Sequence, residues 1–390
     1  MYRNTYVEVN EDTIKNNIKE IKEKYPDYTY YIGVVKGNAY GHGAYVTKAM
    51  QEAGINYFAT SSLEEAIEVR KYNTDTPILC LEPIDSQYIE DILRYNVTVT
   101  IDSLSLAEHY NELEFKGKLK VHLKLDTGMN RLGMKTKEEL HKVIHLLEKN
   151  NSFMIEGIYT HMATTGINDF YYDKQVNTFL KLTKEIDLKK IPIVHLGRSL
   201  TLVNHPKLDF VTGVRLGIIL YGLNGSMPIR GGIRGWLSEK KRNHFLKKYH
   251  VSRTVRQNDL KVKTAFSLYT EVMSLKKIKA GEFVGYGAKF IAKEDGFIAT
   301  IPIGYADGMK KSLKYLSIHD KKYTIIDVCM DMTMVLVDAN IKLHDKVEIF
   351  GNTISIKEAS RNIGENVYHL FLSVTSRVPR IYKEEIEIKY

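Results

Sequence analysis

The sequence predicts an α/β protein in which a (β/α)8 barrel of the TIM type is followed by a mainly antiparallel β domain. Between residues 30 and 218, short apolar, β-branched runs alternate with stretches of helical period, as expected for βα units around a parallel sheet. From about residue 260, short alternating strands recur with turn residues between them. Eight units in about 200 residues fit a barrel better than an open doubly wound sheet, although an open sheet of six or seven strands remains an alternative.

The barrel strands are expected where an apolar run is followed by enough residues for one helix. They fall at 30–37, 57–61, 77–82, 97–102, 120–126, 154–161, 191–197 and 209–217. Amphipathic spacing predicts helices between them at 63–72, 86–95, 137–149 and 172–186.

The β domain is expected to contain strands at 267–275, 282–290, 297–305, 322–330, 333–339, 346–351 and 384–390. Residues 5–10 read as a further strand of this domain, before a helix that Asn10 or Asp12 opens. The predicted division is therefore a barrel at 10–224, a basic insert at 225–263 and a β domain at 264–390, joined by residues 1–9.

The composition is that of a soluble globular protein, because 44% of the 390 residues are hydrophobic and 26% are charged. No run approaches the roughly 18 apolar residues of a membrane span. The first residues lack the apolar stretch of a secretory signal. Two cysteines, Cys80 and Cys329, are too few for a disulfide framework and agree with a reducing compartment. We therefore expect a cytoplasmic protein.

The net charge of +9 is concentrated in the predicted insert. Residues 225–263 hold eleven Lys or Arg against Glu239 and Asp259, so this segment carries the whole excess. The remainder is neutral, which argues against nucleic-acid binding by the fold. The insert, which also holds Trp236, is interpreted as a solvated elaboration or a dimer-rim element, with an anionic partner as the alternative.

The first barrel strand leads into VVKGNAYGHG, residues 34–43, which places Lys36 at the carboxyl end of the strand. Barrel enzymes keep their chemistry on that face. A surface lysine before a glycine turn is the simpler interpretation. However, a lysine that leaves a buried strand beside glycines suits an imine with an aldehyde cofactor.

Two further motifs end barrel strands with polar groups. Lys124, Asp126 and Arg131 lie close together in LKLDTGMNRLG, and an arginine fork recognises carboxylates at two points. In the second motif, Arg215, Gly217 and Ile218 end the eighth strand, and Ser199 follows the seventh. The loops after strands seven and eight are the usual phosphate site of this fold.

Together, these motifs resemble those of the alanine racemase family, which are pyridoxal 5'-phosphate enzymes with a barrel and a β domain. The likeness runs almost from end to end, through VVKGNAYGHG, KLDTGMNRLG, YTHMA, VRLGIILYG, VGYGAKF, IGYADG, VCMDM and SRVPR in the family's order. It implies an isomerase that interconverts L- and D-alanine, supplies D-alanine for peptidoglycan, and uses no metal.

The resemblance also implies roles for individual residues. Lys36 would form the Schiff base with the cofactor and act as the base on one face of the substrate, and Tyr286 of a partner subunit would act on the other. Arg215 would donate to the pyridine nitrogen and His161 would support it. Arg131 would meet the phenolic oxygen of the cofactor and the substrate carboxylate.

Further positions follow from the same resemblance. Lys124 stands where the family often has a carbamylated lysine, whose negative charge orients the nearby arginine. Met330, from the partner, would face the substrate carboxylate, so the active form should be a homodimer. The phosphate contacts would come from Tyr40, Ser199, Gly217, Ile218 and the position of Ser376.

Four features depart from the family pattern. Ser376 stands where tyrosine is common, and the lost ring would leave room for serine or a larger amino acid. Arg198 replaces a common asparagine, Lys311 replaces a common arginine, and the basic insert has no family role to transfer. The alternatives to alanine racemisation are therefore a serine or broad-specificity racemase, then an amino-acid decarboxylase or a non-enzymatic carrier of the cofactor.

Overall fold

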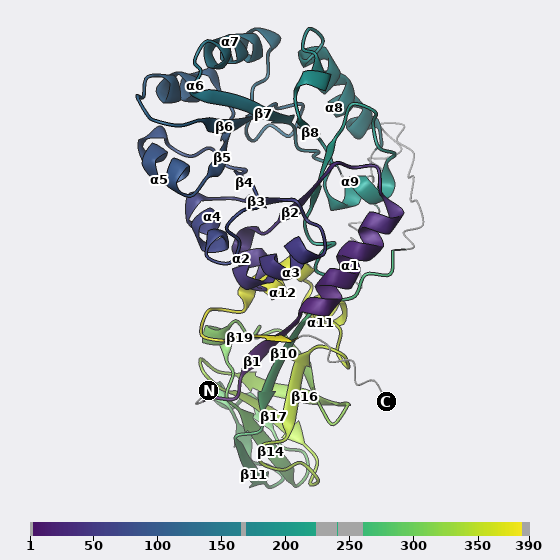
Figure 1. Ribbon diagram of the computed structural model, residues 1–390. Coiled ribbons are helices and arrows are strands. Elements are labelled where there is room, and N and C mark those ends of the chain that lie inside the picture. Colours follow the sequence, from purple (N-terminus) through teal and green to yellow (C-terminus); the bar gives the residue numbers. More distant parts are fainter. Residues whose placement is uncertain (1–2, 165–168, 224–239, 241–259, 384–390) are drawn as a thin grey trace, which may run out of the picture.

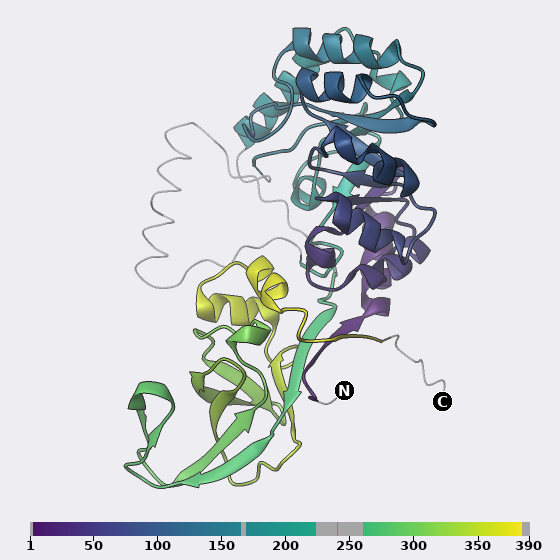
Figure 2. The same cartoon turned by 90° about the vertical axis from the view of Figure 1, so that its left-hand side faces the viewer.

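The chain forms two units that lie end to end, and a computed structural model describes residues 3–164, 169–223, 240 and 260–383. Figure 1 shows a unit of strands and surrounding helices above a unit built mainly of strands. Figure 2 shows the same two units at opposite ends of an elongated molecule. Most of the predicted insert at 225–263 lies outside the described residues, so its interpretation stays a prediction, as do the exact domain limits.

Eight parallel strands form the first unit: β2 (Tyr30–Val34), β3 (Tyr57–Thr60), β4 (Ile78–Cys80), β5 (Val97–Ile101), β6 (Leu119–Lys124), β7 (Phe153–Tyr159), β8 (Ile193–His195) and β9 (Gly213–Leu216). Their spatial order is β8-β7-β6-β5-β4-β3-β2-β9. The two ends of this order meet, because the amide of Thr212 donates to the carbonyl oxygen of Val194 at 3.0 Å. The predicted barrel is confirmed as a nearly closed one, and the open-sheet alternative is wrong.

Helices cover the outside of the barrel (Figure 1). They are α1 (Glu11–Lys24), α3 (Thr47–Glu52), α4 (Leu63–Arg70), α5 (Ile89–Arg94), α6 (Leu104–Asn111), α7 (Lys137–Glu148), α8 (Asp169–Leu182) and α9 (Ser199–Asn204). The short element α2 (Lys36–Tyr40) follows the carboxyl end of β2 instead. Short polar side chains begin several of them, since Ser62, Ser103 and Thr136 each accept a hydrogen bond from an amide three residues later. Asn10 accepts from the amide of Thr13 at 2.7 Å, which confirms it as the cap of the first helix.

The second unit contains β1 (Tyr6–Asn10), β10 (Phe266–Glu271), β11 (Ser274–Ile278), β12 (Phe283–Val284), β13 (Phe290–Ile291), β14 (Gly296–Ile301), β15 (Tyr315–Ile318), β16 (Lys321–Val328), β17 (Thr333–Val337), β18 (Lys346–Phe350) and β19 (Arg380–Lys383), with α11 (Ile356–Ile363) and α12 (Val367–Ser373). Nine of these strands form one sheet in the order β11-β14-β17-β16-β15-β18-β10-β1-β19. Strands β12 and β13 form a separate hairpin.

The first strand belongs to this sheet, as expected from the sequence. Val7 of β1 faces Leu268 in an antiparallel pair and Arg380 in a parallel one. The sequence did not predict β15 or β19, which are only four residues long. The strand expected at 384–390 lies outside the described residues.

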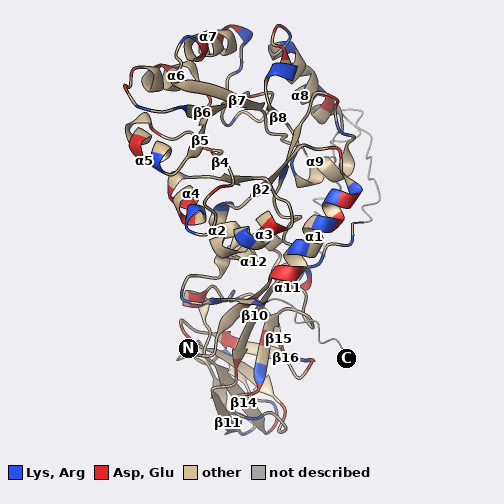
Figure 3. Cartoon of the chain, in the orientation of Figure 1, with Lys and Arg blue, Asp and Glu red and all other residues tan. Residues whose placement is uncertain are grey.

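Charged side chains of both signs are distributed over the helix surfaces (Figure 3). Helix α1 alternates lysines with glutamates, and α4 has two glutamates in its first turn and Arg70 in its last. Among the described residues, no helix has both the length and the apolar character needed to cross a bilayer.

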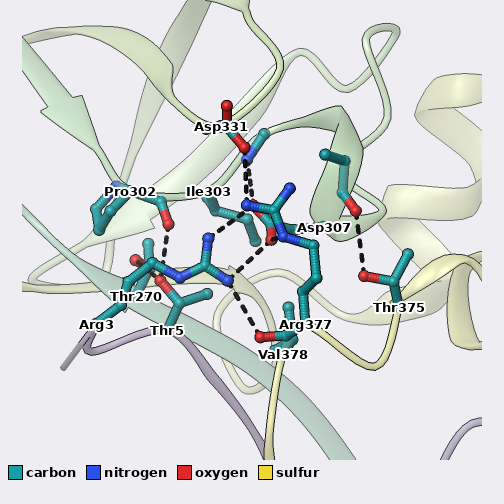
Figure 4. A network of polar contacts seen from close by, with 12 residues as sticks. Arg3, Thr5, Thr270, Pro302, Ile303, Asp307, Asp331, Thr375, Arg377 and Val378 are labelled. Carbon is teal, nitrogen blue, oxygen red and sulfur yellow. Dashed lines mark hydrogen bonds and ion pairs between the residues drawn. The ribbon is translucent and has the colours of Figure 1, made fainter. Parts of the chain in front are cut away.

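A buried carboxylate ties three distant parts of the second unit together (Figure 4). Asp307 ends the short turn η5 (Tyr305–Asp307) and is 0% exposed. Arg3 donates to both of its oxygens, at 3.1 and 2.8 Å, and the Nε of Arg377 lies 3.4 Å from one of them. Arg377 also pairs with the exposed Asp331 at 2.8 Å. The first residues of the chain, η5 and the segment after α12 therefore meet at one acid.

We predict that Asp307→Ala lowers the free energy of unfolding by about 2–3 kcal/mol, because two arginines lose their buried partner. Asp331→Ala is the matched control and should cost under about 1 kcal/mol, since that pair is exposed. Urea denaturation of the two variants measures both values. Equal losses would show that burial of Asp307 adds nothing to the network.

Candidate active site

A cavity of about 600 Å³ opens at the carboxyl ends of the barrel strands. The structure brings all the predicted site residues of the barrel to its lining: Lys36, Tyr40, Lys124, Arg131, His161, Ser199, Arg215, Gly217 and Ile218. The lining also contains Val34, Leu81, Glu82, Pro83, Leu132, Tyr159, Arg198, Leu200 and Tyr368. Residues that follow different strands therefore share one pocket, as the strand pattern predicted.

The cavity is strongly cationic. Its only carboxylate among the described residues is that of Glu82, whereas its cations are Lys36, Lys124, Arg131, Arg198 and Arg215. Lys36, Arg131 and Arg198 form no ion pair with any part of the chain that the structure describes. Such an excess of positive charge in a concave site favours an anionic ligand.

Lys36 begins a left-handed turn directly after the first barrel strand. Gly37, Asn38, Ala39 and Tyr40 have φ values of 63°, 51°, 52° and 53°. Only glycine adopts this conformation without cost, and each other residue adds roughly 1–2 kcal/mol. The sequence indicated a glycine turn here, but three of the four residues are not glycine. This strain needs a stabilising contact from outside the turn.

Glu65 supplies that contact. Its Oε1 accepts a hydrogen bond from the amide of Gly37 at 2.6 Å. Its Oε2 accepts from the amide and the hydroxyl of Ser61, both at 2.9 Å. One carboxylate in the first turn of α4 thus joins the turn that carries Lys36 to the end of β3. Sequence reasoning missed this residue, because a glutamate near a helix start reads as an ordinary helix charge.

Hydroxyl and amide groups gather at the ends of β8 and β9. The amide of Gly217 donates to the hydroxyl of Ser199 at 2.9 Å. A Cβ atom at Gly217 would lie 2.7 Å from the hydroxyl of Tyr40, so a larger residue here would displace that hydroxyl. Burial raises the pKa of Tyr40, which keeps its phenol protonated and able to donate. We call Tyr40, Ser199, Gly217 and Ile218 the hydroxyl-amide cup; its donors suit a phosphate.

Arg215 lies on β9 and is 2% exposed. It donates to the carbonyl oxygens of Thr160, His195 and Leu196 at 2.8, 2.9 and 3.0 Å, and to Nδ1 of His195 at 2.6 Å. Burial lowers its pKa to about 10, so it keeps its charge at neutral pH. Its side-chain histidine partner is therefore His195, which sequence reasoning did not select.

His161 lines the same cavity but has a different relation to Arg215. Burial and the charge of Arg215 lower the pKa of His161 to about 2, so its imidazole is neutral. The effect of the arginine on this histidine is electrostatic. The supporting role expected for His161 stays a prediction.

A chain of buried polar groups leads from Arg215 across the barrel. Because Arg215 can only donate, Nδ1 of His195 accepts and its Nε2 carries the proton toward Nδ1 of His122 at 3.0 Å. Nε2 of His122 in turn lies 3.4 Å from Oε2 of Glu156. Burial alone would raise the pKa of Glu156, but contacts from His122, Tyr57 and Lys120 lower it to about 2. A carboxylate therefore ends the chain.

Lys124 ends β6 and donates to the carbonyl oxygen of Leu81 at 3.1 Å. Its Nζ also lies 5.4 Å from the ring centre of Tyr159. Burial, followed by the charges of Arg131 and Arg215, lowers the pKa of Lys124 to about 8. A substantial fraction of this amine is thus neutral slightly above neutral pH, and only a neutral amine is a nucleophile.

Tyr286 lies far from this lining, in the turn η4 (Tyr286–Ala288) of the β12–β13 hairpin, and is 78% exposed. Its amide donates to Oδ2 of Asp327 at 3.0 Å. Gly285, which precedes it, has a φ of 80°, and a Cβ there would come within 2.8 Å of the same carboxylate oxygen. Asp327 therefore fixes the backbone of a tyrosine whose ring projects from the surface.

Met330 and Ser376 also lie outside the cavity lining. Met330 is 54% exposed, and Ser376 lies in the exposed segment between α12 and β19. Tyr368 of α12 lines the cavity instead, with its ring centre 5.9 Å from that of Tyr40. The expectation that Ser376 leaves room beside the substrate stays a prediction. With 26 tyrosines in the sequence, no local pattern singled out Tyr368.

Two family models match the chain. The N-terminal domain of alanine racemase matches residues 9–225, and the C-terminal domain matches residues 265–382. Among curated proteins, alanine racemase of Anoxybacillus flavithermus is 33% identical, with 100% of this chain and 98% of the relative covered.

Solved structures give the same result. Alanine racemase from Bacillus anthracis, solved with bound L-Ala-P, is 30% identical with a TM-score of 0.85 and covers 99% of this chain and 96% of its own. Histidine racemase from Leuconostoc mesenteroides has the same TM-score of 0.85 at 26% identity, with 98% of each chain covered.

We predict that Glu65→Ala speeds amide hydrogen exchange at Gly37 by about 10- to 100-fold, because the turn loses its external acceptor. Glu64→Ala is the matched control, since Glu64 is the exposed neighbour on the same helical turn. Exchange at residues 36–43, followed by mass spectrometry, separates the two variants. Unchanged exchange at Gly37 in Glu65→Ala would show that the turn holds itself.

Proposed function

The chain belongs to the alanine racemase family, and on this premise we propose that it interconverts L- and D-alanine with pyridoxal 5'-phosphate as its cofactor. The observation that carries the proposal is the single cavity that combines Lys36, a set of unpaired cations and the hydroxyl-amide cup. These groups suit one ligand that has an aldehyde, a phosphate and an aromatic ring. The substrate adds a carboxylate, which the remaining cations suit equally.

The residues of the cavity fit this cofactor. The cup offers the neutral phenol of Tyr40 and the hydroxyl of Ser199 to a phosphate, and the amide of Gly217 holds that hydroxyl in place. Arg215 would face the pyridine nitrogen. Because a guanidinium gives up its proton only with difficulty, it would keep that nitrogen unprotonated and limit side reactions. When bound, pyridoxal phosphate supplies an electron sink that makes the α-proton of an amino acid removable.

Proton transfer would fall to two side chains on opposite faces of the substrate. Lys36, at the end of β2, would attach the cofactor and move the proton on one face. Tyr286 would move it on the other face, but it is 78% exposed and does not line the cavity of its own subunit. Inversion of the α-carbon therefore requires a partner.

Exposed apolar side chains of the second unit support the proposal of a homodimer. Phe283, Tyr286, Ile291 and Met330 are large apolar side chains that lie exposed in it. Exposed apolar surface of this kind marks sites of protein association. We propose that this surface meets the cavity of a second copy, so that Tyr286 and Met330 complete the partner's site.

The cellular setting is proposed on the same basis. The family resemblance points to D-alanine supply for peptidoglycan, and two unpaired thiols, Cys80 and Cys329, are compatible with the reducing cytoplasm. The alternatives considered from the sequence lose support. The alanine racemase relatives favour alanine over serine or a broader range of substrates. The C-terminal family match argues against a decarboxylase or a barrel-only carrier.

We predict that the cofactor-loaded protein converts L-alanine to a mixture of both enantiomers, and that Tyr286→Phe slows this about 10²- to 10⁴-fold, the usual contribution of a general acid or base. Chiral chromatography of the products measures both. Tyr315→Phe, at another exposed tyrosine of the same unit, is the control and should keep its activity. Full activity in Tyr286→Phe would remove this tyrosine from the mechanism, and preference for serine or lysine would redefine the substrate.

We also predict that Lys124 becomes carbamylated by carbon dioxide, because its pKa of about 8 leaves part of the amine neutral. The negative charge of a carbamate would then hold Arg131. Carbon-13 NMR with labelled bicarbonate should show a carbamate signal that grows as the pH rises through about 8, where the ammonium form disappears. The signal should vanish in Lys124→Arg and persist in Lys120→Arg, on the same strand. A signal that survives Lys124→Arg would place the modification elsewhere.

A further inference from the structure

Arg198 is a cationic residue of the cavity lining, and the proposed reaction assigns it no role. It precedes Ser199 in the chain, and its backbone forms an isolated β-bridge with Arg215. Its carbonyl oxygen accepts from the amide of Leu202 at 3.0 Å, which fixes the backbone at the start of α9. Arg198 therefore stands beside two residues of the site.

The guanidinium of Arg198 is held in the cavity without a partner. Its Nε is buried and makes no hydrogen bond, and its side chain forms no ion pair with any residue that the structure describes. A buried polar atom of a cation is costly to leave without an acceptor. The guanidinium of Arg198 is therefore suited to bind an anion that enters the cavity.

The surroundings indicate where that anion binds. Burial lowers the pKa of Arg198, and the phenols of Tyr368 and Tyr40 raise it, so both rings lie near the guanidinium. The hydroxyl of Tyr40 belongs to the hydroxyl-amide cup beside Gly217. Arg131, the candidate for the substrate carboxylate, repels Arg198. Because Arg198 directly precedes Ser199 of the cup and lines the same cavity, an anion at the cup end is within the part of the cavity that Arg198 shares.

We propose that Arg198 is a direct ligand of the cofactor's phosphate and converts the cup from a neutral site into a charge-assisted one. The inference rests on the proposed function for the identity of the cofactor. A guanidinium fork can donate two parallel hydrogen bonds to phosphate oxygens, which hydroxyls and amides of the cup cannot do alone. Retention of the cofactor should then depend on its phosphate and fall with rising salt.

The test compares two ligands that differ only in the phosphate. Apo-protein is titrated with pyridoxal 5'-phosphate and with pyridoxal, and binding is followed by absorbance. Arg198→Gln should raise the Kd for pyridoxal phosphate about 10- to 100-fold, the factor that corresponds to a charge-assisted hydrogen bond, and leave the Kd for pyridoxal unchanged. Arg94→Gln, at an exposed arginine outside the cavity, is the control.

Inorganic phosphate provides a second readout that does not depend on Lys36. It should compete with pyridoxal phosphate for the wild-type protein and compete more weakly in Arg198→Gln. Arg198→Lys should lie between the two, because it keeps the charge and loses the fork. This variant also serves if the glutamine variant fails to fold.

Three results would overturn the proposal. These are an unchanged Kd for pyridoxal phosphate in Arg198→Gln, an equal loss for both ligands, or a changed KM for alanine with unchanged cofactor affinity. Failure of the proposed function looks different, since the wild-type protein would then bind no pyridoxal phosphate or racemise no alanine.

Discussion

The repulsion among five cations that converge on one cavity is the constraint on which the site depends. Lys36, Lys124, Arg131, Arg198 and Arg215 come from different turns of the barrel, yet only the carboxylate of Glu82 joins them among the described residues. Three features of the structure reduce this repulsion. Burial shifts Lys124 toward its neutral form, a chain of buried polar contacts connects Arg215 to the distant Glu156, and the remaining cations are available to anions of a ligand. A cavity charged in this way is poorly suited to neutral molecules and well suited to a phosphate and a carboxylate.

Much of this arrangement could be predicted from the sequence, because it depends on local pattern. Eight apolar segments form the buried strands of the barrel. Polar residues that follow these strands at their carboxyl ends line the same cavity. The features that the sequence did not predict are contacts between residues far apart in the chain. Nothing near Tyr368 indicates that it lies beside Tyr40, and nothing near Glu65 indicates that it holds the amide of Gly37.

In the second unit, the backbone of an exposed tyrosine is held in a fixed position. Tyr286 projects into solvent, so packing cannot fix it, and Asp327 instead holds its amide while Gly285 provides the backbone angle. Beneath the hairpin, Ile278, Ala292 and Ile298 form a small apolar cluster. The tyrosine thus has a fixed backbone and an exposed ring.

The pairing of β1 with both β10 and β19 has a consequence for synthesis on the ribosome. Arg3 and its partner Asp307 are 304 positions apart. At about 5–20 residues per second, the first strand therefore waits on the order of tens of seconds for the segments that cover it. During that time it is an unpaired edge, which other chains could capture. The polar residues that alternate with Val7 and Val9 reduce this risk, so the opening strand of the chain must remain soluble long before it becomes part of a sheet.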